Sequence, residues 1–484
     1  MQINKDGVQK QSKLSGLFSL TFFLFSSLVM AQGFEDFKRM QHNSFSAYRN
    51  ADDSKFSTYL KSQWKEFQGE ESAPLYEKKK PKSITPTVQK RIKSLGPRVR
   101  IDLKKTLNTP KKVQEVQKTS TKDINLIYFG QRVGVDRDDA FKEAKFYPPD
   151  QNGVSNFFAT LASSDYEVTL SDIKNIVKHL NLNDWGLYLL VNKVAESIYS
   201  NPDDRKLFSW FVFNKLGYAV KVGLSSNHII LMFYSEKIIY STPNYELNHK
   251  KFYVLSNYAK EFSSRIYTYK QNYPQSNKAF DLALTSLPNF LEDMQTKTLN
   301  FSQLGKEYRL SYSYDKNLID FMATYPQADY ETFFNAPMQS ETYKNIAKGL
   351  RTYIDGKSSS VALNFVLNFV QKAFIYEVDQ KQFAREKVMF AQETLFYSKS
   401  DCEDRAILFS YLVKELFGIS VIGVKYKDHM ATALYIPMRG DSVKKGRRKF
   451  VIADPTYINA NIGQSMPKYK AIIPESFIVV KRGK

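Results

Sequence analysis

The chain contains a single cysteine, Cys402, and only five histidines among its 484 residues. One cysteine cannot form an internal disulfide, so this residue is either a small buried apolar side chain or a reactive thiol. Five scattered histidines and one cysteine do not make a zinc cluster, and we expect no metal site. The sequence also lacks a phosphate-binding glycine loop, which argues against a nucleotide cofactor. We therefore expect chemistry without any cofactor.

Long apolar runs are scarce too, and only LFSLTFFLFSSLVM within residues 1–31 stands out. Lys10 and Lys13 precede this run and Ala31 follows it, a pattern typical of a secretory signal peptide. The run is short for a membrane span, although an uncleaved N-terminal anchor is the alternative. We expect an exported bacterial protein, periplasmic or secreted, whose mature chain begins near Gln32.

Positive charge dominates, with a formal net charge of +21, and much of it lies in residues 78–122. Before this stretch, residues 32–70 carry aromatic side chains at helical spacing, which predicts an N-terminal helical segment. Residues 71–123 are rich in lysine and proline and poor in aromatics, which predicts a disordered linker. An alternative is an electrostatic tether to an anionic surface such as a membrane, a nucleic acid or a cell-wall polymer.

The rest of the chain contains an internal repeat. The segment 207–220 is LFSWFVFNKLGYAV and the segment 408–421 is LFSYLVKELFGISV, which align without a gap. The same offset places His228 on His429. Two further matches occur in the same order, so we predict two related domains, 124–260 and 341–484, joined by strands in 261–340.

The two copies differ at the positions that could carry chemistry. The second copy has about two dozen extra residues leading to Cys402, whereas the first has only SNPDDR at this point. The thiol position of the first copy holds Ser200, Asn201 or Pro202. Where YSTPNY aligns with ADPTY, Thr242 stands in the place of Asp454. We expect the first copy to be inert and His228 not to be catalytic.

The setting of Cys402 favours a reactive thiol. Residues 403–417 are apolar on nearly every face, which predicts a buried helix that Ser400 or Asp401 caps and Gly418 ends. Cys402 then lies in the first helical turn, where the helix dipole and unpaired backbone N–H groups favour a thiolate over a thiol. The same N–H groups can hold an oxyanion during acyl transfer.

Two further residues complete a possible triad. VIGVKY and HMATALYI read as two strands around a Lys427-Asp428 turn, so His429 begins the second strand. KFVIADP reads as a third strand with Asp454 at its edge. Taken singly, a lone histidine or an Asp before Pro is usually structural, and a cysteine on an apolar helix usually packs. Together they follow the order of a thiol–imidazole–carboxylate triad.

The motifs DCEDRA, DHMATALY and IADPTYINA together resemble the catalytic core of the transglutaminase-like superfamily, cysteine enzymes with a papain-like α+β fold. The resemblance implies Cys402 as nucleophile, His429 as general base and acid, and Asp454 as the residue that orients the imidazole. It also implies an upstream oxyanion partner, for which Gln392 and Tyr397 are weak candidates.

The resemblance implies acyl chemistry at an amide through a thioester. Water as acceptor gives a hydrolase of peptide or isopeptide bonds, and an amine gives a cross-linking acyltransferase. We expect hydrolysis of a protein or peptide substrate, for example in the cell envelope. The basic segment 438–449 could attract acidic substrates, although a solvated hairpin tip is the simpler interpretation. A non-catalytic binding scaffold is the competing hypothesis.

Overall fold

The computed structural model describes residues 50–71, 85–102, 121–255 and 264–481. The signal peptide predicted in residues 1–31 lies outside these ranges. No helix within them is long and apolar enough to cross a membrane. The chain divides after Ser62 into two units. Residues 50–60, in the first unit, are helical, and everything described below belongs to the second unit.

The second unit contains two lobes that follow one plan. The described elements of the first lobe are the strands β2 (Ile124–Tyr128) and β3 (Gln131–Val135), the helices η1 (Asp139–Glu143), α2 (Gln151–Ala162), α3 (Tyr166–His179), α4 (Asp184–Ile198) and α5 (Pro202–Lys215), and the strands β4 (Val220–Ser225), β5 (His228–Tyr234), β6 (Pro243–Leu247), β7 (Lys250–Tyr253) and β8 (Arg265–Thr268).

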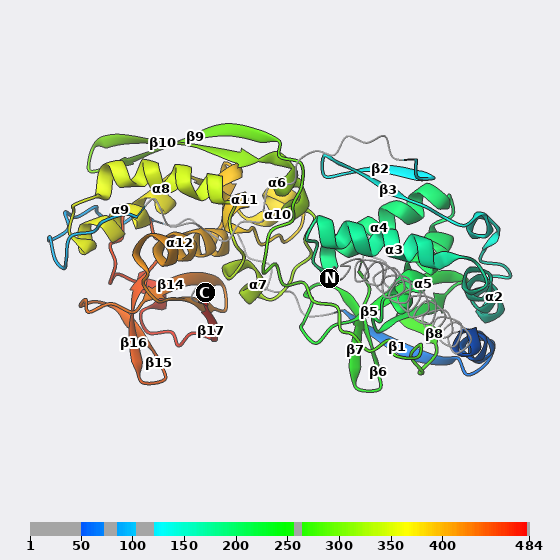
Figure 1. Cartoon of the computed structure of the whole chain (residues 1–484). Coiled ribbons are helices and arrows are strands. Elements are labelled where there is room, and N and C mark those ends of the chain that lie inside the picture. The colour runs from blue at the N-terminus through cyan, green and yellow to red at the C-terminus, as the bar shows by residue number, and fades with distance from the viewer. Residues whose placement is uncertain (1–49, 72–84, 103–120, 256–263, 482–484) are drawn as a thin grey trace, which may run out of the picture. The chain divides into compact units, whose positions relative to one another are not determined.

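The second lobe repeats this series with insertions. Its described elements are β9 (Met294–Gln303), β10 (Lys306–Asp315), α6 (Lys316–Ala323), α7 (Tyr330–Phe334), α8 (Ser340–Ile354), α9 (Ser359–Lys372), β11 (Ile375–Tyr376), α10 (Asp379–Phe383), α11 (Ala391–Phe396), β12 (Lys399–Ser400), α12 (Cys402–Phe417), β13 (Val421–Tyr426), β14 (His429–Leu434), β15 (Ser442–Lys445), β16 (Arg448–Ala453), η2 (Pro467–Tyr469) and β17 (Ser476–Val479). Figure 1 shows its layers, with the β9–β10 hairpin over α8, α12 beneath, and the sheet that contains β14 below.

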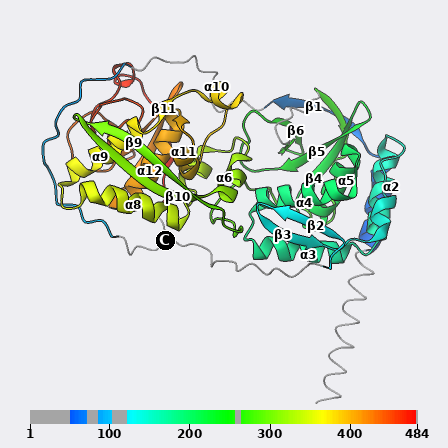
Figure 2. The ribbon, with the colours of Figure 1, turned by 90° about the horizontal axis from the view of Figure 1, so that it is seen from above.

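Strand order shows that the predicted repeat extends to topology. The second lobe has an antiparallel sheet in the order β15-β16-β14-β13-β17, and the first lobe has β6-β7-β5-β4-β8. In each lobe a buried helix, α12 or α5, packs on the two central strands. Each lobe also begins with a hairpin that packs on helices, α8 and α9 in one case and α3 and α4 in the other (Figure 2).

These hairpins correct the domain boundaries expected from the sequence. The strands predicted in residues 261–340 include β9 and β10, but they pack on α8 and α9 and so belong to the second lobe. The strands predicted in residues 261–340 also do not allow for helix α6, which lies in the same range. Asp315 caps this helix by accepting a hydrogen bond from the backbone N–H of Asn317. Its buried residues lie at helical spacing, which outweighs a short apparent alternation.

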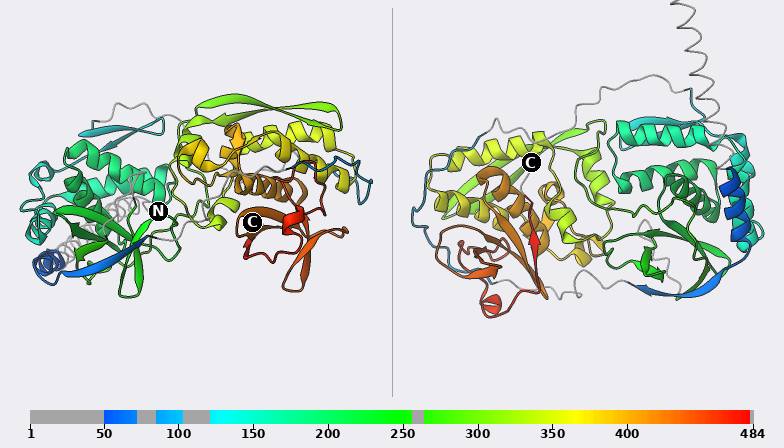
Figure 3. Two further views of the ribbon diagram at one scale, coloured as in Figure 1. Left: turned by 180° about the vertical axis from the view of Figure 1, so that it is seen from behind. Right: turned by 60° about the horizontal axis from the view of Figure 1, so that its bottom comes forward.

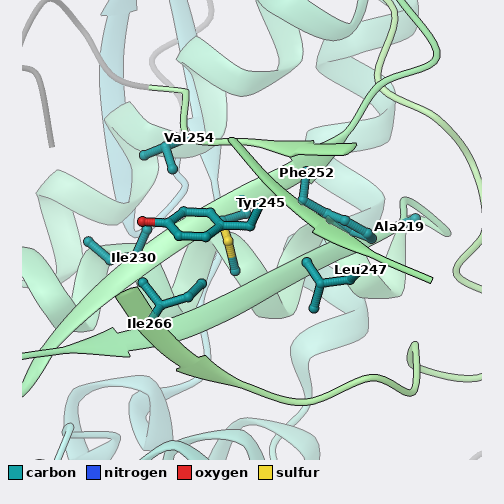
Figure 4. Close-up of a cluster of buried hydrophobic side chains, with 8 residues drawn as sticks. Ala219, Ile230, Tyr245, Leu247, Phe252, Val254 and Ile266 are labelled. Atoms are coloured by element: carbon teal, nitrogen blue, oxygen red, sulfur yellow. The ribbon is translucent and has the colours of Figure 1, made fainter. Parts of the chain in front are cut away.

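The expectation of a helical segment over residues 32–70 is correct only in part. Residues 32–49 lie outside the described ranges, and Lys65–Glu71 forms a strand, β1. β1 pairs antiparallel with both β6 and β8, which closes the first-lobe sheet into a barrel (Figure 3). An apolar cluster that includes Tyr245, Phe252 and Ile266 lies among these strands (Figure 4). Phe67 of β1 packs against this cluster. The strand forms because it pairs with β6 and β8. Since these partners lie far along the chain, the local helical spacing does not predict the strand.

The predicted disordered linker, residues 71–123, also contains an ordered part. Residues 85–102 run extended along the second lobe; residues 72–84 and 103–120 lie outside the described ranges. The backbone N–H of Val99 donates to the carbonyl oxygen of Lys357 at 2.8 Å, and that of Leu95 donates to the Ser360 hydroxyl at 2.8 Å. The segment therefore binds largely through its main chain, with Arg98 also donating to the Gly356 carbonyl oxygen, and composition alone misses this strap.

Candidate active site

Helix α12 places Cys402 at its first position, as the sequence predicts. Asp401 has the extended backbone of an N-cap residue, and its own N–H donates to Asp404 Oδ2 at 3.2 Å. Gly418 ends the helix with a left-handed φ of 64°, a conformation that glycine adopts without steric cost. The thiol is buried, with only 1% of the residue exposed. The helix N-terminus therefore holds its nucleophile candidate away from bulk water.

His429 begins strand β14 after a two-residue turn. Strands β13 and β14 pair in register, with Tyr426 opposite His429. The imidazole is buried, and its Nε2 lies 2.9 Å from Asp454 Oδ2. Because Nε2 bonds Asp454, Nδ1 is the ring nitrogen left for the Cys402 sulfur, which helps to raise the pKa of His429.

Asp454 follows strand β16 and is held by its own loop. Its Oδ1 accepts hydrogen bonds from the backbone N–H groups of Thr456 at 2.9 Å and Tyr457 at 3.2 Å. The loop itself is tied to helix α9, because Gln371 Nε2 donates to the carbonyl oxygens of Asp454, Tyr457 and Ala460. One carboxylate oxygen is therefore fixed by the backbone, and the other is aimed at His429.

The structure thus brings Cys402, His429 and Asp454 to a single buried place. Burial alone would lower the pKa of His429, but the Asp454 carboxylate and the Cys402 sulfur outweigh it and raise this pKa to about 9. The imidazole is therefore charged at neutral pH. A cationic imidazole between a sulfur and a carboxylate is the arrangement of a thiol–imidazole–carboxylate triad.

Tyr469, which the sequence analysis did not identify, covers the histidine. Its ring stacks on His429 with the centroids 4.7 Å apart and the planes 20° from parallel. The Tyr469 hydroxyl donates to Asp428 Oδ1 at 2.8 Å, which anchors the ring at the turn before β14. Since Tyr469 comes from helix η2, after the third member of the triad, no local motif reveals it.

The arm that precedes Cys402, residues 377–401, is held by acidic side chains of helix α12. Asp404 Oδ1 accepts the backbone N–H of Met389 at 2.8 Å. A buried ion pair between Lys387 and Glu393, at 2.7 Å, braces the arm internally. Arg405 is fully buried and donates to the backbone carbonyl of Phe374 at 2.8 Å, which ties the start of α12 to the end of α9.

The same region concentrates buried negative charge. Burial raises the pKa values of Asp379 and Asp401 well above the ordinary range, and the neighbouring carboxylates raise them further. Glu403 Oε2 also lies 2.9 Å from Cys402 Sγ. Three acidic oxygens, one each from Asp379, Asp401 and Asp404, lie within 4.8 Å of one another. Such oxygens could hold a hard cation or share protons. The positions of the histidines and of the single cysteine in the sequence do not indicate this acidic cluster.

The two oxyanion candidates, Gln392 and Tyr397, both lie in the arm that precedes Cys402. Gln392 Oε1 accepts the backbone N–H of Gln339, whose neighbour Met338 contacts the Tyr411 hydroxyl. Tyr411 lies nine residues beyond Cys402 on α12, about 13 Å along the helix axis. The Gln392 Nε2 is buried and has no hydrogen-bond partner among the described residues, so the assignment of Gln392 as an oxyanion donor stays a prediction.

Tyr397, the other candidate, packs its ring against Phe383 and Phe396, with centroids 5.1 Å and 4.9 Å apart. These contacts place the ring on α10 and α11, in the arm. The resemblance implies an oxyanion partner upstream of the thiol. In this chain the upstream candidates belong to the inserted arm, so the packing of the arm decides where they lie.

The first lobe has a different constellation at the corresponding place. Asn201 occupies the thiol position and caps helix α5 by accepting the Asp203 N–H. His228 Nδ1 lies 2.9 Å from Asp203 Oδ2, so its partner comes from the helix and not from a strand. The side chain of His228 is 75% exposed. The lobe retains an imidazole–carboxylate pair without a thiol.

The register of the strands corrects the sequence alignment at the third position. Leu247 pairs with Lys250 across the β6–β7 turn as Lys445 pairs with Arg448 across the β15–β16 turn. Counting on from this turn, the position of Asp454 corresponds to residue 256, a serine outside the described ranges. Thr242 instead precedes β6, so the ADPTY-like segment was matched to the wrong strand.

Comparisons of the chain with protein-family models, with curated proteins and with solved structures found no match.

Proposed function

We propose that the second lobe is a transglutaminase-like cysteine enzyme with a papain-like α+β fold that hydrolyses peptide or isopeptide bonds. One observation carries the proposal. A single buried imidazole hydrogen-bonds the carboxylate of Asp454 and interacts with the sulfur at the start of helix α12, which helps to raise its pKa. Core packing alone does not require a cysteine, a histidine and an aspartate from three elements to converge in this order.

The first chemical step forms a thioester. His429 holds the proton of Cys402, and the resulting thiolate attacks the carbonyl carbon of the substrate amide. The oxygen of that carbonyl gains the negative charge, and backbone N–H groups at the start of α12 stabilise it. His429 then donates its proton from Nδ1 to the leaving nitrogen, the carbon–nitrogen bond breaks, and the amine departs.

The second step releases the acyl group. A water molecule gives a proton to the now neutral His429 and attacks the thioester carbon. The carbon–sulfur bond breaks, the carboxylic acid leaves, and the proton returns to the thiolate–imidazole pair. Asp454 keeps the imidazole in one orientation throughout, because its second oxygen is fixed by the Thr456 and Tyr457 N–H groups.

The acceptor distinguishes hydrolysis from cross-linking. A primary amine in place of water would give an isopeptide bond by the same two steps. Incubating the protein with a glutamine-containing peptide and a labelled amine measures both products, free acid and labelled amide. We propose that the acid predominates.

Alkylation tests the proposal directly, because Cys402 is the only thiol in the chain. Iodoacetamide should label the folded protein at neutral pH to one equivalent, and His429→Ala should abolish rapid labelling. The matched control is His228→Ala, which removes the corresponding imidazole from the first lobe. Labelling that occurs only after denaturation, or that both variants leave unchanged, would favour the binding scaffold.

We also propose that the protein acts outside the cytoplasm on a protein or peptide of the cell envelope. This rests on the apolar run in residues 1–31. Residues 78–122 remain a candidate contact with an anionic surface, although their ordered part, 85–102, is bound along the second lobe. Cell fractionation with an antibody tests export: recovery only in the cytoplasmic fraction would contradict it.

A further inference from the structure

The two lobes differ at one edge of their sheets. In the first lobe, β1 fills the space between β6 and β8 and closes the barrel. In the second lobe, the corresponding strands β15 and β17 are the two edges of an open sheet within the described residues. An open pair of edges offers backbone N–H and C=O groups to an additional strand.

Register identifies the positions that a strand equivalent to β1 would meet. β1 pairs with Pro243–Tyr245 of β6, and the β6–β7 turn aligns these residues with 441–443. β1 also pairs with Arg265–Thr268 of β8. Strand β8 pairs with β4 as β17 pairs with β13, and this correspondence aligns Arg265–Thr268 with residues 474–477. The incoming strand would therefore lie between 441–443 and 474–477.

A cavity of about 510 Å³ is present there. Its lining includes Asp441, Ser442, Val443, Pro474 and Phe477, which are the positions that register alone selects. Tyr426 and Tyr469 form part of the same lining, and both rings stack with His429. The cavity therefore adjoins the candidate active site.

Burial shows that the edge residues of the second lobe lack the cover that β1 supplies in the first. Tyr245 and Thr268, which β1 covers, are fully buried. Their counterparts, Val443 and Phe477, are only half-buried and pack at the margin of an apolar cluster. A side chain placed like Phe67 of β1 would complete that cluster.

Charge indicates the composition of the missing strand. β1 reads KEFQGEE, and its acidic side chains approach basic ones: Glu66 lies 3.4 Å from Arg265, and Glu70 lies 3.7 Å from Lys251. In the second lobe Lys444 lines the cavity, and Lys445 Nζ lies 5.9 Å from the centre of the Phe477 ring. The rest of the hairpin adds Arg447, Arg448 and Lys449.

We propose that the cleft between β15 and β17 binds an extended acidic peptide of a partner protein as an added strand, with one apolar side chain directed into the cavity. The first lobe contains the same arrangement, made by its own chain. Main-chain pairing would supply affinity, the apolar side chain would fix register, and the basic hairpin would select acidic sequences. This assigns a role to the basic segment 438–449 that does not depend on catalysis.

A fluorescent peptide tests the docking site. The probe is an acetylated KEFQGEE peptide with a fluorescein label, titrated into full-length Cys402→Ala protein, which cannot consume it by thiol chemistry. We expect saturable anisotropy. The peptide with phenylalanine replaced by alanine should bind about tenfold more weakly, as expected when a buried anchor is truncated. The labelled peptide should not replace β1 in the first lobe, because β1 is tethered to the chain and is therefore present at a high effective concentration.

Variants locate the binding. Lys444→Glu with Lys445→Glu should weaken binding about tenfold, with a reduced dependence on salt. The control is Lys348→Glu with Arg351→Glu on α8, which makes the same charge change away from the cleft and should leave binding within about twofold. Thermal melts check that both double variants are folded. Absent binding, equal binding of the two peptides, or equal effects of the two double variants would overturn the proposal.

One more outcome concerns the occupant. The protein could form a dimer at the concentrations used. If the probe peptide and the Lys444→Glu/Lys445→Glu change both dissociate that dimer, a second copy of the chain fills the cleft. That result would overturn the assignment to a partner protein. Docking and catalysis remain separable, because the alkylation of Cys402 in the unmodified protein does not depend on peptide binding.

Discussion

The two lobes share a strand order and a helix–hairpin frame, yet they treat the same histidine position in opposite ways. His228 is exposed and pairs with Asp203 from the adjacent helix, whereas His429 is buried between Cys402 and Asp454. The same sheet therefore supports either an imidazole–carboxylate pair alone or such a pair together with a thiol. What differs is the delivery of a thiol to the helix start, with an arm of about two dozen residues to hold it.

The lobes also differ in how their sheets end. The first lobe closes its sheet with a strand from the N-terminal segment, and the second leaves the corresponding edges open beside the triad. The closed lobe has no thiol and the open lobe has one. Our proposal gives a scaffolding role to the first lobe and chemistry to the second, and the following variants test that division.

The largest effect is expected from the two histidines. His429→Ala should slow alkylation of Cys402 and any amide hydrolysis by about 10²–10⁴-fold, because the thiolate loses its proton acceptor. His228→Ala should change neither rate. Iodoacetamide kinetics followed by intact-protein mass measure both variants. A comparable loss in both would end the functional distinction between the lobes.

The paired carboxylates should differ in their contribution to stability. Asp454→Ala leaves a buried charged imidazole without its partner and should lower the free energy of unfolding by about 3–5 kcal/mol. Asp203→Ala should cost less, about 1–3 kcal/mol, because water can solvate the exposed His228 and the main loss is the acceptor of the Ile229 backbone N–H. Urea unfolding at pH 7 gives both values. Equal losses of unfolding free energy in the two variants would show that burial of the His429–Asp454 pair does not increase its contribution to stability.

The second pair should also make stability depend on pH. Because the pKa of His429 rises from its ordinary value near 6.5 to about 9, protonation stabilises the folded state. This contribution is fully present below pH 6.5 and is lost as the pH rises through about 9. Asp454→Asn should flatten that decline, and Asp203→Asn should not. Unfolding curves between pH 6 and pH 10 are the measurement, and a decline unchanged in Asp454→Asn would contradict the assignment.

A smaller effect is expected from the ring that covers the site. Tyr469→Ala should expose His429 and raise the rate at which a bulky maleimide reaches Cys402 severalfold, because the stacked cover is lost. Tyr469→Phe keeps the ring and loses only the Asp428 hydrogen bond, so it should react at nearly the rate of the unmodified protein. Slower labelling of the alanine variant would mean that the ring does not limit access.

Much of the second lobe was readable from local sequence because its signals are local. A buried helix that begins at Cys402, a two-residue turn before His429 and a strand ending before Pro455 are each encoded within a dozen residues, and the structure has all three. Their convergence followed from the order of the elements. The internal repeat was readable because the match of 207–220 with 408–421 has no gap.

Features that depend on distant partners were missed. β1 resembles part of an amphipathic helix until β6 and β8 are known to flank it, and the strap 85–102 binds through its backbone. Tyr469 reaches His429 from a helix forty residues further along the chain. The Thr242 alignment failed because a short Pro-x-Tyr motif lies within strand β6 in the first lobe and in the loop after β16 in the second. Long-range pairing, not composition, decided each case.

Capture of an acyl-enzyme tests the central claim most directly. An activated ester of a glutamine-containing peptide is mixed with the protein, the reaction is quenched in acid, and intact and peptide masses are measured. We predict one acyl group on the peptide that contains Cys402, released by hydroxylamine, retained in His228→Ala and absent from His429→Ala. An unmodified Cys402, or acylation that His429→Ala leaves intact, would contradict the account.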